Sequence, residues 1–420
     1  MCSGGTNTLE TVPLAMSVVD LTRTLVSIPS HEDETAAGDA LEEWLRTETD
    51  AAVTRDEIGN VIARRRSSDA VDTAETGAAD LRTLALVGHH DVVPPDDAQV
   101  DDGEYVVEER DGRLYGRGTA DMKGSLAAAA IAFRDADLES APDTGLESAS
   151  DADSAPGADS TSGANSGSNA DADPWPGELV FASFVGEEDG GIGARHAIEN
   201  GFAPDYAVVG EGSTNYSGPD VTDVAVAHKG RRASTITARG TASHASEPEA
   251  GENAIYRATD AVDAIRDLEA PSLEVAGDRL EGSLVVTEIE GGSAWNVVPE
   301  NCAITVDERT VPGERASFET VADLEGVEWT VDQDLPPMRC DDGAFADAVR
   351  EAAGRSQSAA PELATKPHAT DAGWLSRAGT ECVIYGASEP GEAHTKTESV
   401  SISVLERCLE TYRRLAARWV

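Results

Sequence analysis

Imidazole and carboxylate side chains follow four apolar runs of this chain, and each run ends in glycine. The runs are LALVG, FASFVG, YAVVG and CVIYG, and the residues after them include His89, Glu187, Glu188, Glu211 and His394. Short apolar runs closed by glycine are typical of buried strands, and in an open α/β sheet ligands bind at the carboxyl ends of the strands. Imidazoles and carboxylates that meet at such an edge bind divalent transition metals. The pattern therefore predicts a metal-dependent enzyme.

The histidines carry more of this prediction than the acids. The chain has 79 Asp and Glu residues but only eight His, so His89 and His394 at two strand ends are the less expected coincidence. Asp91 lies two residues after His89, on the same face of an extended strand, and can orient the second ring nitrogen of His89. His90 points away. The alternative for His89 is an ordinary hydrogen-bonded histidine.

Four acidic positions have possible chemical roles. Asp121 lies in a glycine-rich loop before an Ala-rich helix, where its two oxygens could bridge cations about 3.5 to 4 Å apart. The alternative is a helix N-cap. Glu187 and Glu188 are adjacent and point in different directions, so one can bind metal while the other stays free as a base. For these two and for Glu211, the alternative is a solvated acidic surface.

Three further candidates lie in the middle of the chain. His244 is in a loop before a predicted helix, from which it could reach across a cleft and stabilise an oxyanion. Asn296 and Arg309 could present a hydrogen-bond donor and a fixed cation to a substrate carboxylate. For these two residues, structural capping is the alternative.

The elements that must position these residues predict an α/β fold with an insertion, and 420 residues allow two or three domains. Residues 1–223 and 337–420 hold the glycine-closed strands, and we expect a mixed sheet flanked by helices as the catalytic metal-binding domain. Residues 224–336 follow the order strand, helix, strand, strand, helix, strand, which predicts a ferredoxin-like α+β lid or dimerisation domain. Residues 138–177 are rich in Ala, Ser, Asp and Gly, and we expect them to be a disordered insertion.

The charge balance excludes several classes of partner. The net charge is -47, and only four residues are lysines, which is typical of a halophilic protein. Such a charge repels nucleic acids and anionic membranes. The five scattered cysteines form no CxxC pair, which favours reduced thiols in the cytoplasm. The chain contains no run of eighteen apolar residues, so the sequence predicts no membrane span.

The motifs taken together resemble the dinuclear-zinc family of amidohydrolases and exopeptidases. That family includes acetylornithine deacetylase, succinyl-diaminopimelate desuccinylase, aminoacylase and glutamate carboxypeptidase. The resemblance covers nearly the whole chain except the first fifteen residues and the insertion. It is carried by the segments GHHDVVP, DGRLYGRGTADMKGSLAA, FVGEEDGGIGA, VVGEGS, GTASHASEPEAGENA, GGSAWNVVPENC, DERT and GEAHTKTE.

The resemblance implies two divalent metal ions, with Zn²⁺ expected first and Co²⁺ or Mn²⁺ as substitutes. Asp121 would bridge the two ions. His89 and Glu211 would complete one site, and Glu188 and His394 the other.

The resemblance also implies roles for the remaining candidates. Asp91 would support His89, and Glu187 would be the general base. His244 would be the oxyanion donor of the inserted domain, which in several relatives comes from the other subunit of a dimer. Asn296 and Arg309 would contact the carboxylate end of the substrate.

The expected function is hydrolysis of the amide bond of an N-acyl amino acid. A water held between two metals would lose a proton to Glu187 as it attacks the carbonyl. The nearest alternative is a dipeptidase or carboxypeptidase with the same metals. From a different class, a non-catalytic binding protein is disfavoured by the intact base Glu187. We further expect a small-molecule substrate and a homodimer formed through the inserted domain.

Overall fold

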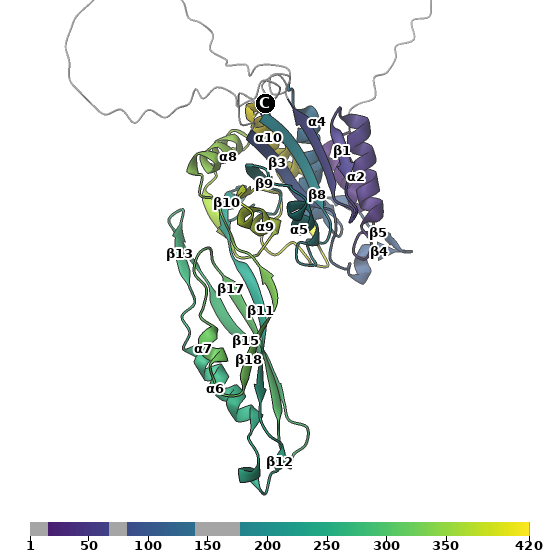
Figure 1. Ribbon diagram of the computed structural model, residues 1–420. Coiled ribbons are helices and arrows are strands. Elements are labelled where there is room, and N and C mark those ends of the chain that lie inside the picture. Colours follow the sequence, from purple (N-terminus) through teal and green to yellow (C-terminus); the bar gives the residue numbers. More distant parts are fainter. Residues whose placement is uncertain (1–15, 67–81, 139–176, 420) are drawn as a thin grey trace, which may run out of the picture.

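The structure, a computed structural model, describes residues 16–66, 82–138 and 177–419. Figure 1 shows a layered body, with a sheet between helices, from which a long second sheet extends. The first fifteen residues and nearly all of the segment predicted to be disordered lie outside the described residues. No helix within the described ranges is long and apolar enough to cross a membrane.

The larger sheet is mixed, as the sequence predicted. Its central neighbours β8, β3, β9 and β21 run parallel, and they contain the four apolar runs that are followed by the candidate site residues. Because parallel strands present their carboxyl ends at one edge, these residues converge there. In the described residues nine strands form this sheet, in the order β1 (Ala52–Arg55), β2 (Val61–Arg66), β8 (Gly177–Phe184), β3 (Arg82–His89), β9 (Tyr206–Val209), β21 (Glu381–Ile384), β10 (Val224–His228) and β19 (Met338–Arg339), with β20 (Leu363–Lys366) paired to β10.

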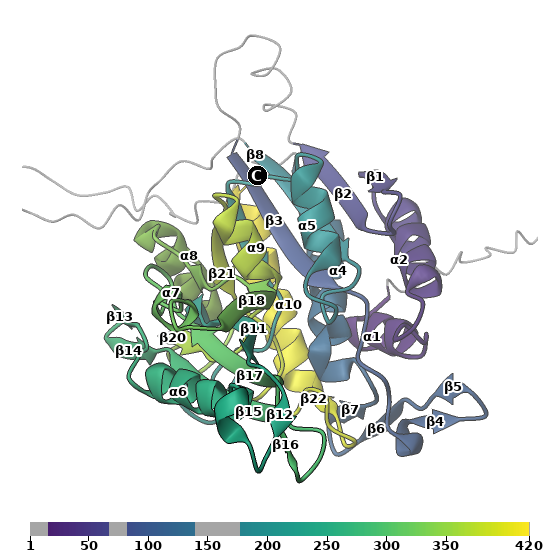
Figure 2. The same cartoon turned by 60° about the horizontal axis from the view of Figure 1, so that its bottom comes forward.

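Helices cover both faces of the large sheet (Figures 1 and 2). Side chains of β3 alternate between the two faces: Leu84 and Leu86 join one core, and Ala85 and Val87 join the other. Both faces of the strands are therefore buried, which explains why their sequences are continuously apolar. The first face packs against α1 (Val18–Val26), α2 (Thr35–Glu48), α4 (Gly124–Asp135), α8 (Gly343–Arg355) and α10 (Ile402–Trp419), and the second against α5 (Ile192–Glu199) and α9 (Asp371–Arg377).

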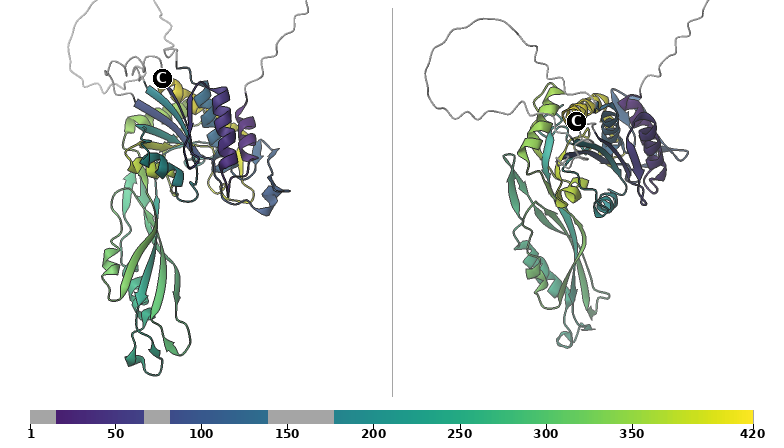
Figure 3. Two further views of the ribbon diagram at one scale, coloured as in Figure 1. Left: turned by 45° about the vertical axis from the view of Figure 1, so that its right-hand side comes forward. Right: turned by 45° about the horizontal axis from the view of Figure 1, so that its top comes forward.

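The second sheet, called the small sheet below, extends away from the large one (Figures 1 and 3). In the described part of the chain it has four antiparallel strands, in the order β15 (Ser283–Gly291), β17 (Asn301–Thr310), β11 (Gly230–Arg239) and β18 (Val327–Leu335). Helices α6 (Ala254–Arg266) and α7 (Glu319–Ala322) contribute to a separate core with it. The expected α/β fold with an inserted ferredoxin-like unit is confirmed.

The chain enters the small sheet after β10 and leaves it before β19. Because β10 still pairs within the large sheet, this passage comes at Lys229, later than the boundary at residue 224 expected from the sequence. The apolar run VAVAH of β10 carries no signal that separates the two sheets.

Several short elements were not predicted from the sequence. They have few apolar residues, so no periodic pattern marks them. They are β4 (Val100–Asp101), β5 (Glu104–Tyr105), β6 (Glu108–Arg110), β7 (Arg113–Tyr115), β12 (Ser243–His244), β13 (Ser272–Val275), β14 (Asp278–Glu281), β16 (Val297–Val298), β22 (Ser399–Ser401) and the single helical turns η1 (Asp97–Gln99), η2 (Thr119–Lys123) and η3 (Pro248–Ala250).

Candidate metal centre

The ends of the four parallel strands bring five of the predicted residues to one edge of the large sheet. His89 is the last residue of β3, Glu187 and Glu188 follow β8, and Glu211 follows β9. His394 lies in the loop after β21. The strand order β8, β3, β9, β21 places these ends side by side.

Two groups of metal-ligand atoms form at this edge. In each group, one atom from each residue lies within 4.8 Å of the others. The first group is His89, Glu187 and Glu211, and the second is Asp121, Glu188 and His394.

Asp121 faces both groups. Its Oδ1 is 3.2 Å from Nε2 of His89, and its Oδ2 is 2.8 Å from Nε2 of His394. The side chain does not cap α4, because the N-cap position of that helix is Lys123. A carboxylate whose two oxygens point to two different imidazoles has the geometry of a bridging metal ligand.

The other contacts follow the same division. Nε2 of His89 is 3.4 Å from Oε1 of Glu211, and Nε2 of His394 is 2.9 Å from Oε1 of Glu188. His89 is 1% exposed, whereas the side chain of His394 is 49% exposed. The first group is therefore the inner one, and the second lies nearer to solvent.

Asp91 holds His89 from behind. Nδ1 of His89 is 3.1 Å from the carbonyl oxygen of Asp91 and 3.3 Å from its Oδ1, while Oδ2 of Asp91 accepts the backbone N–H of Glu188 at 3.0 Å. His90 points the other way, and its Nδ1 is 2.7 Å from Oγ of Ser183. One carboxylate thus orients His89 and ties β3 to the loop after β8.

The histidines carry high pKa values in the metal-free protein. Hydrogen bonds to Asp121 and Glu188 raise the pKa of His394 to about 10. Burial opposes a charge on His89, yet the surrounding carboxylates, Asp91 first, raise its pKa well above the usual value. In the metal-free protein, protons on the two histidines therefore offset the negative charges of the surrounding carboxylates, and divalent cations would offset the same charges.

The glutamates differ from one another in their electrostatics. Burial raises the pKa of Glu187 well above its ordinary value, and burial also raises the pKa of Glu188. Burial pushes the pKa of Glu211 upward too, but Lys366 and His89 outweigh it and leave the pKa lowered.

Lys366 is a site residue that the sequence did not reveal. It ends β20, is 6% exposed, and its Nζ lies 3.1 Å from Oε2 of Glu211. Glu211 thus offers one oxygen to His89 and the other to a buried ammonium group. Lys366 also lines a pocket of about 300 Å³, together with Tyr216, His368 and every member of the two ligand groups except His89.

Glu398 is a second residue that sequence reasoning missed. Its buried carboxylate accepts the backbone N–H groups of Ala120 at 3.0 Å and Asp121 at 3.2 Å, and it pairs with Arg117. Burial raises its pKa to about 7, against the opposing charge of Arg117. The only signal in the sequence is its place four residues after His394, so its partners nearly 280 residues away could not be predicted.

Arg309 lies at the end of the small sheet that is nearest to the large sheet. It pairs in register with Arg231, and the neighbouring Thr310 pairs with Gly230, the residue after Lys229. The backbone N–H of Lys229 donates to the carbonyl of Lys366. The positive charge of Arg309 contributes to lowering the pKa of His368 in the pocket, although burial is the larger cause.

His244 and Asn296 are not brought to the metal-ligand groups within this chain. Both are exposed, and His244 is in β12, at the far end of the small sheet from the large one (Figure 1). They lie near each other, since the N–H of Ala245 donates to the carbonyl of Asn296 at 2.9 Å.

The chain is similar to known metallohydrolases over most of its length. A model of peptidase family M20/M25/M40 matches residues 85–144 and 168–418. An acetylornithine deacetylase from Myxococcus xanthus is 31% identical over 354 residues, covering 80% of each chain. A succinyl-diaminopimelate desuccinylase from Xylella fastidiosa is 26% identical over 416 residues, covering 96% of this chain and 98% of the relative.

Solved structures share the fold at lower identity. Aminopeptidase PepT from Bacillus cereus has a TM-score of 0.68 and 18% identity, covering 96% of this chain and 97% of that one. A dinuclear metal binding peptidase of the M20 family from Bacillus subtilis has a TM-score of 0.63 and 15% identity, covering 95% and 96%.

We predict that Glu398→Gln weakens metal binding by about 10- to 100-fold. Both carboxylate oxygens of Glu398 accept hydrogen bonds, so the NH₂ group of glutamine would face another donor and loosen the loop that carries Asp121. The measurement is competition with a chromogenic chelator. Glu351→Gln on the surface of α8 is the matched control and should leave the metal affinity unchanged. An unaltered affinity in Glu398→Gln would rule out this positioning role.

Proposed function

Because the chain belongs to peptidase family M20/M25/M40, we propose that it is a metal-dependent amidohydrolase that releases an amino acid from an N-acyl conjugate. The observation that supports this most directly is the placement of Asp121 between two imidazoles, with Glu187 beside them. Relatives named as an acetylornithine deacetylase and a succinyl-diaminopimelate desuccinylase support the deacylase assignment.

The donor set fits two divalent cations, and we propose Zn²⁺ in both positions, with Co²⁺ or Mn²⁺ as substitutes. His89 and Glu211 would hold one ion, Glu188 and His394 the other, and Asp121 both. When bound, such ions polarise a carbonyl oxygen and lower the pKa of water. Neutral imidazoles and ionised carboxylates are the required ligand states.

Glu187 is proposed as the general base. Among the described residues its carboxylate makes no hydrogen bond, unlike the carboxylates of Glu188 and Glu211, so it is free to accept a proton. It lies beside His89 and Glu211, so it would be within reach of a water held by the metals. The same carboxyl group can then donate that proton to the departing amine.

The pocket separates charges in a way that suits an N-acyl amino acid. The ligand groups present carboxylates on one side, while Lys366 lines the pocket beyond Glu211 and Arg309 approaches from the small sheet. We propose that Arg309 binds the α-carboxylate of the amino acid, which would place its acylated nitrogen toward the ligand groups.

We further propose that His244 and Asn296 act in the site of a partner subunit. Their place at the far end of the small sheet leaves them remote from their own ligand groups (Figure 1). In a homodimer formed through residues 224–336, the end of one small sheet would reach the other subunit's pocket. His244 would donate to the oxyanion there, and Asn296 would bind the carboxylate end of the substrate.

The substitution Glu187→Gln should lower kcat by about 10²- to 10⁴-fold, because glutamine cannot take a proton from water. The metal content should remain that of the unchanged protein. Turnover is measured as amine release from N-acetylornithine, N-succinyl-diaminopimelate, N-acetylmethionine and simple dipeptides. Metal-dependent hydrolysis of an acyl-amino acid supports the deacylase assignment. Preference for dipeptides would instead support a peptidase assignment. Undiminished turnover by Glu187→Gln would show that Glu187 is not the general base.

Metal affinity should rise with pH between 6 and 8. The pKa of His394 is about 10 and that of His89 is also raised, so both rings are protonated at pH 7 and must lose a proton to bind metal. Each released proton adds about one unit to the slope of log affinity against pH. Calorimetry in buffers of different ionisation enthalpy counts the protons. His394→Gln should release one proton fewer, and pH-independent binding would contradict the ligand assignment.

Mixing two inactive variants tests whether His244 acts across a dimer. Glu187→Gln and His244→Ala should each be inactive, but a mixed dimer would contain one site with both residues. Random exchange of subunits should therefore restore about a quarter of the activity. The activity is measured after the subunits have been exchanged under mild dissociating conditions. A mixture no more active than its components would mean that His244 does not act on the partner's site.

A further inference from the structure

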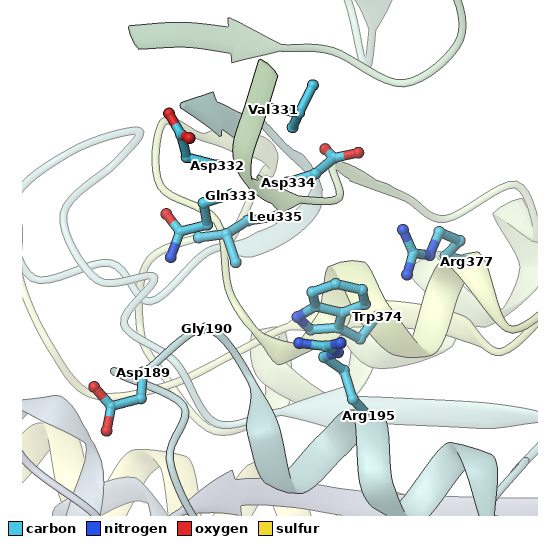
Figure 4. Close-up of a pocket in the computed structure, with 10 residues that line it drawn as sticks. All are labelled: Asp189, Gly190, Arg195, Val331, Asp332, Gln333, Asp334, Leu335, Trp374 and Arg377. Atoms are coloured by element: carbon cyan, nitrogen blue, oxygen red, sulfur yellow. The ribbon is translucent and has the colours of Figure 1, made fainter. Parts of the chain in front are cut away.

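A second pocket lies between the two sheets, apart from the candidate metal centre. Its volume is about 470 Å³, and none of its residues lines the pocket that contains the metal-ligand groups. Residues of α5, α9 and the end of β18 surround it (Figure 4). They are Asp189, Gly190, Arg195, Val331, Asp332, Gln333, Asp334, Leu335, Trp374 and Arg377.

Two arginines in this pocket lack a carboxylate partner. Most arginines of the described ranges contact a carboxylate within 4.0 Å, as expected where 79 acidic residues face 32 basic ones. Within the same ranges, Arg195 and Arg377 form neither an ion pair nor a hydrogen bond. Both residues are exposed, and their N–H donors have no acceptor among the described residues.

Trp374 fixes both guanidinium groups at the pocket. The guanidinium carbon of Arg195 is 5.0 Å from the centroid of the Trp374 ring, and that of Arg377 is 4.2 Å from it. The Trp374 side chain is only 8% exposed, so it is a rigid surface for both cations. Cation–π contact uses the face of a guanidinium group and leaves the N–H donors at its edge free.

The acidic residues of the pocket do not neutralise these arginines. Asp334 pairs with Arg315 at 2.8 Å, and Asp332 accepts a hydrogen bond from Thr235 at 2.8 Å. Figure 4 shows the carboxylate of Asp189 turned away from Trp374. The cationic side of the pocket is therefore left without a counterion.

We propose that this pocket binds a small oxyanion of the carboxylate or phosphate type. Arg195 and Arg377 would each present the N–H donors at the edge of a guanidinium group, and that edge matches the geometry of two oxygens on one carbon or phosphorus atom. Gln333 would add a third donor, because its Oε1 already accepts from Arg231 at 3.2 Å and its amide nitrogen makes no hydrogen bond within the described residues. This site is independent of the proposed catalytic activity.

An oxyanion in this pocket would join the two parts of the fold. The helix α5 follows the loop with Glu187 and Glu188, and α9 begins beside the metal pocket at Asp371, whereas Gln333 belongs to the small sheet. A ligand held by α5, α9 and β18 together would favour the orientation of the small sheet in which all three elements contact it, because only that orientation gains the full binding energy.

The test is a calorimetric titration of the full-length protein with sodium succinate and, separately, with sodium phosphate, at constant ionic strength. Both the metal-loaded and the metal-stripped protein are used, with tryptophan fluorescence as a second readout because the arginines stack on Trp374. We expect saturable binding of at least one anion in both metal states, and the tighter anion identifies the natural class. The double variant Arg195→Gln, Arg377→Gln should weaken the affinity by about tenfold or more.

The matched control removes the same charge elsewhere. Arg350→Gln with Arg355→Gln alters two exposed arginines of α8 that already pair with carboxylates, and it should leave anion affinity unchanged. If the control variant weakened anion affinity equally, the loss would be due to the change in net charge, and the proposed site would be wrong. The absence of saturable binding would also overturn it, as would binding that requires the metals, because that would place the anion at the metal centre.

Discussion

Repulsion between buried and half-buried carboxylates is the constraint on which this structure depends. Glu187 and Glu211 offer oxygens within 4.8 Å of each other, as do Asp121 and Glu188. At an effective dielectric constant of about 20, two charges at that separation repel by about 3.5 kcal/mol. Protons on His89, His394 and Glu187, whose pKa values are all raised, relieve part of this repulsion in the metal-free protein. Divalent cations relieve it further, so the fold holds a site whose ligands are most stable when metals are bound.

The surrounding structure confines these charges with fixed cations and backbone donors. Lys366 takes one oxygen of Glu211, and the Arg117–Glu398 pair holds the backbone of Asp121 in place. Such buried charged groups are costly to desolvate, but they fix the geometry of the ligands. Lys366 leaves one oxygen of Glu211 available to a metal, and Glu398 fixes the direction in which Asp121 points. The positions of the metal ligands therefore depend on the residues that hold them from behind.

The sequence predicted the parts of this arrangement that depend on local pattern. Apolar runs closed by glycine identified the parallel strands, and the residues after them identified the ligands, because parallel strands end at one edge. Lys366 and Glu398 escaped prediction since their partners lie 155 and nearly 280 residues away, and no local pattern encodes such pairs. The positions of His244 and Asn296 likewise depend on how far the small sheet extends, which strand periodicity does not specify.

The chain passes between the two sheets near Lys229 and Pro336, and the hairpin β13–β14 of the inserted segment packs against the core of the large sheet through Val275 and Leu280. That arrangement lets Arg309 approach the metal pocket while His244 stays at the opposite end. It also explains why cations unpaired within the described residues gather at this junction. Arg195 and Arg377 belong to the large-sheet part of the molecule and face β18 of the small sheet. An ion pair between one of these arginines and β18 would therefore fix the position of the small sheet relative to the large sheet. Arginines stacked on Trp374 leave that position responsive to whatever anion binds there.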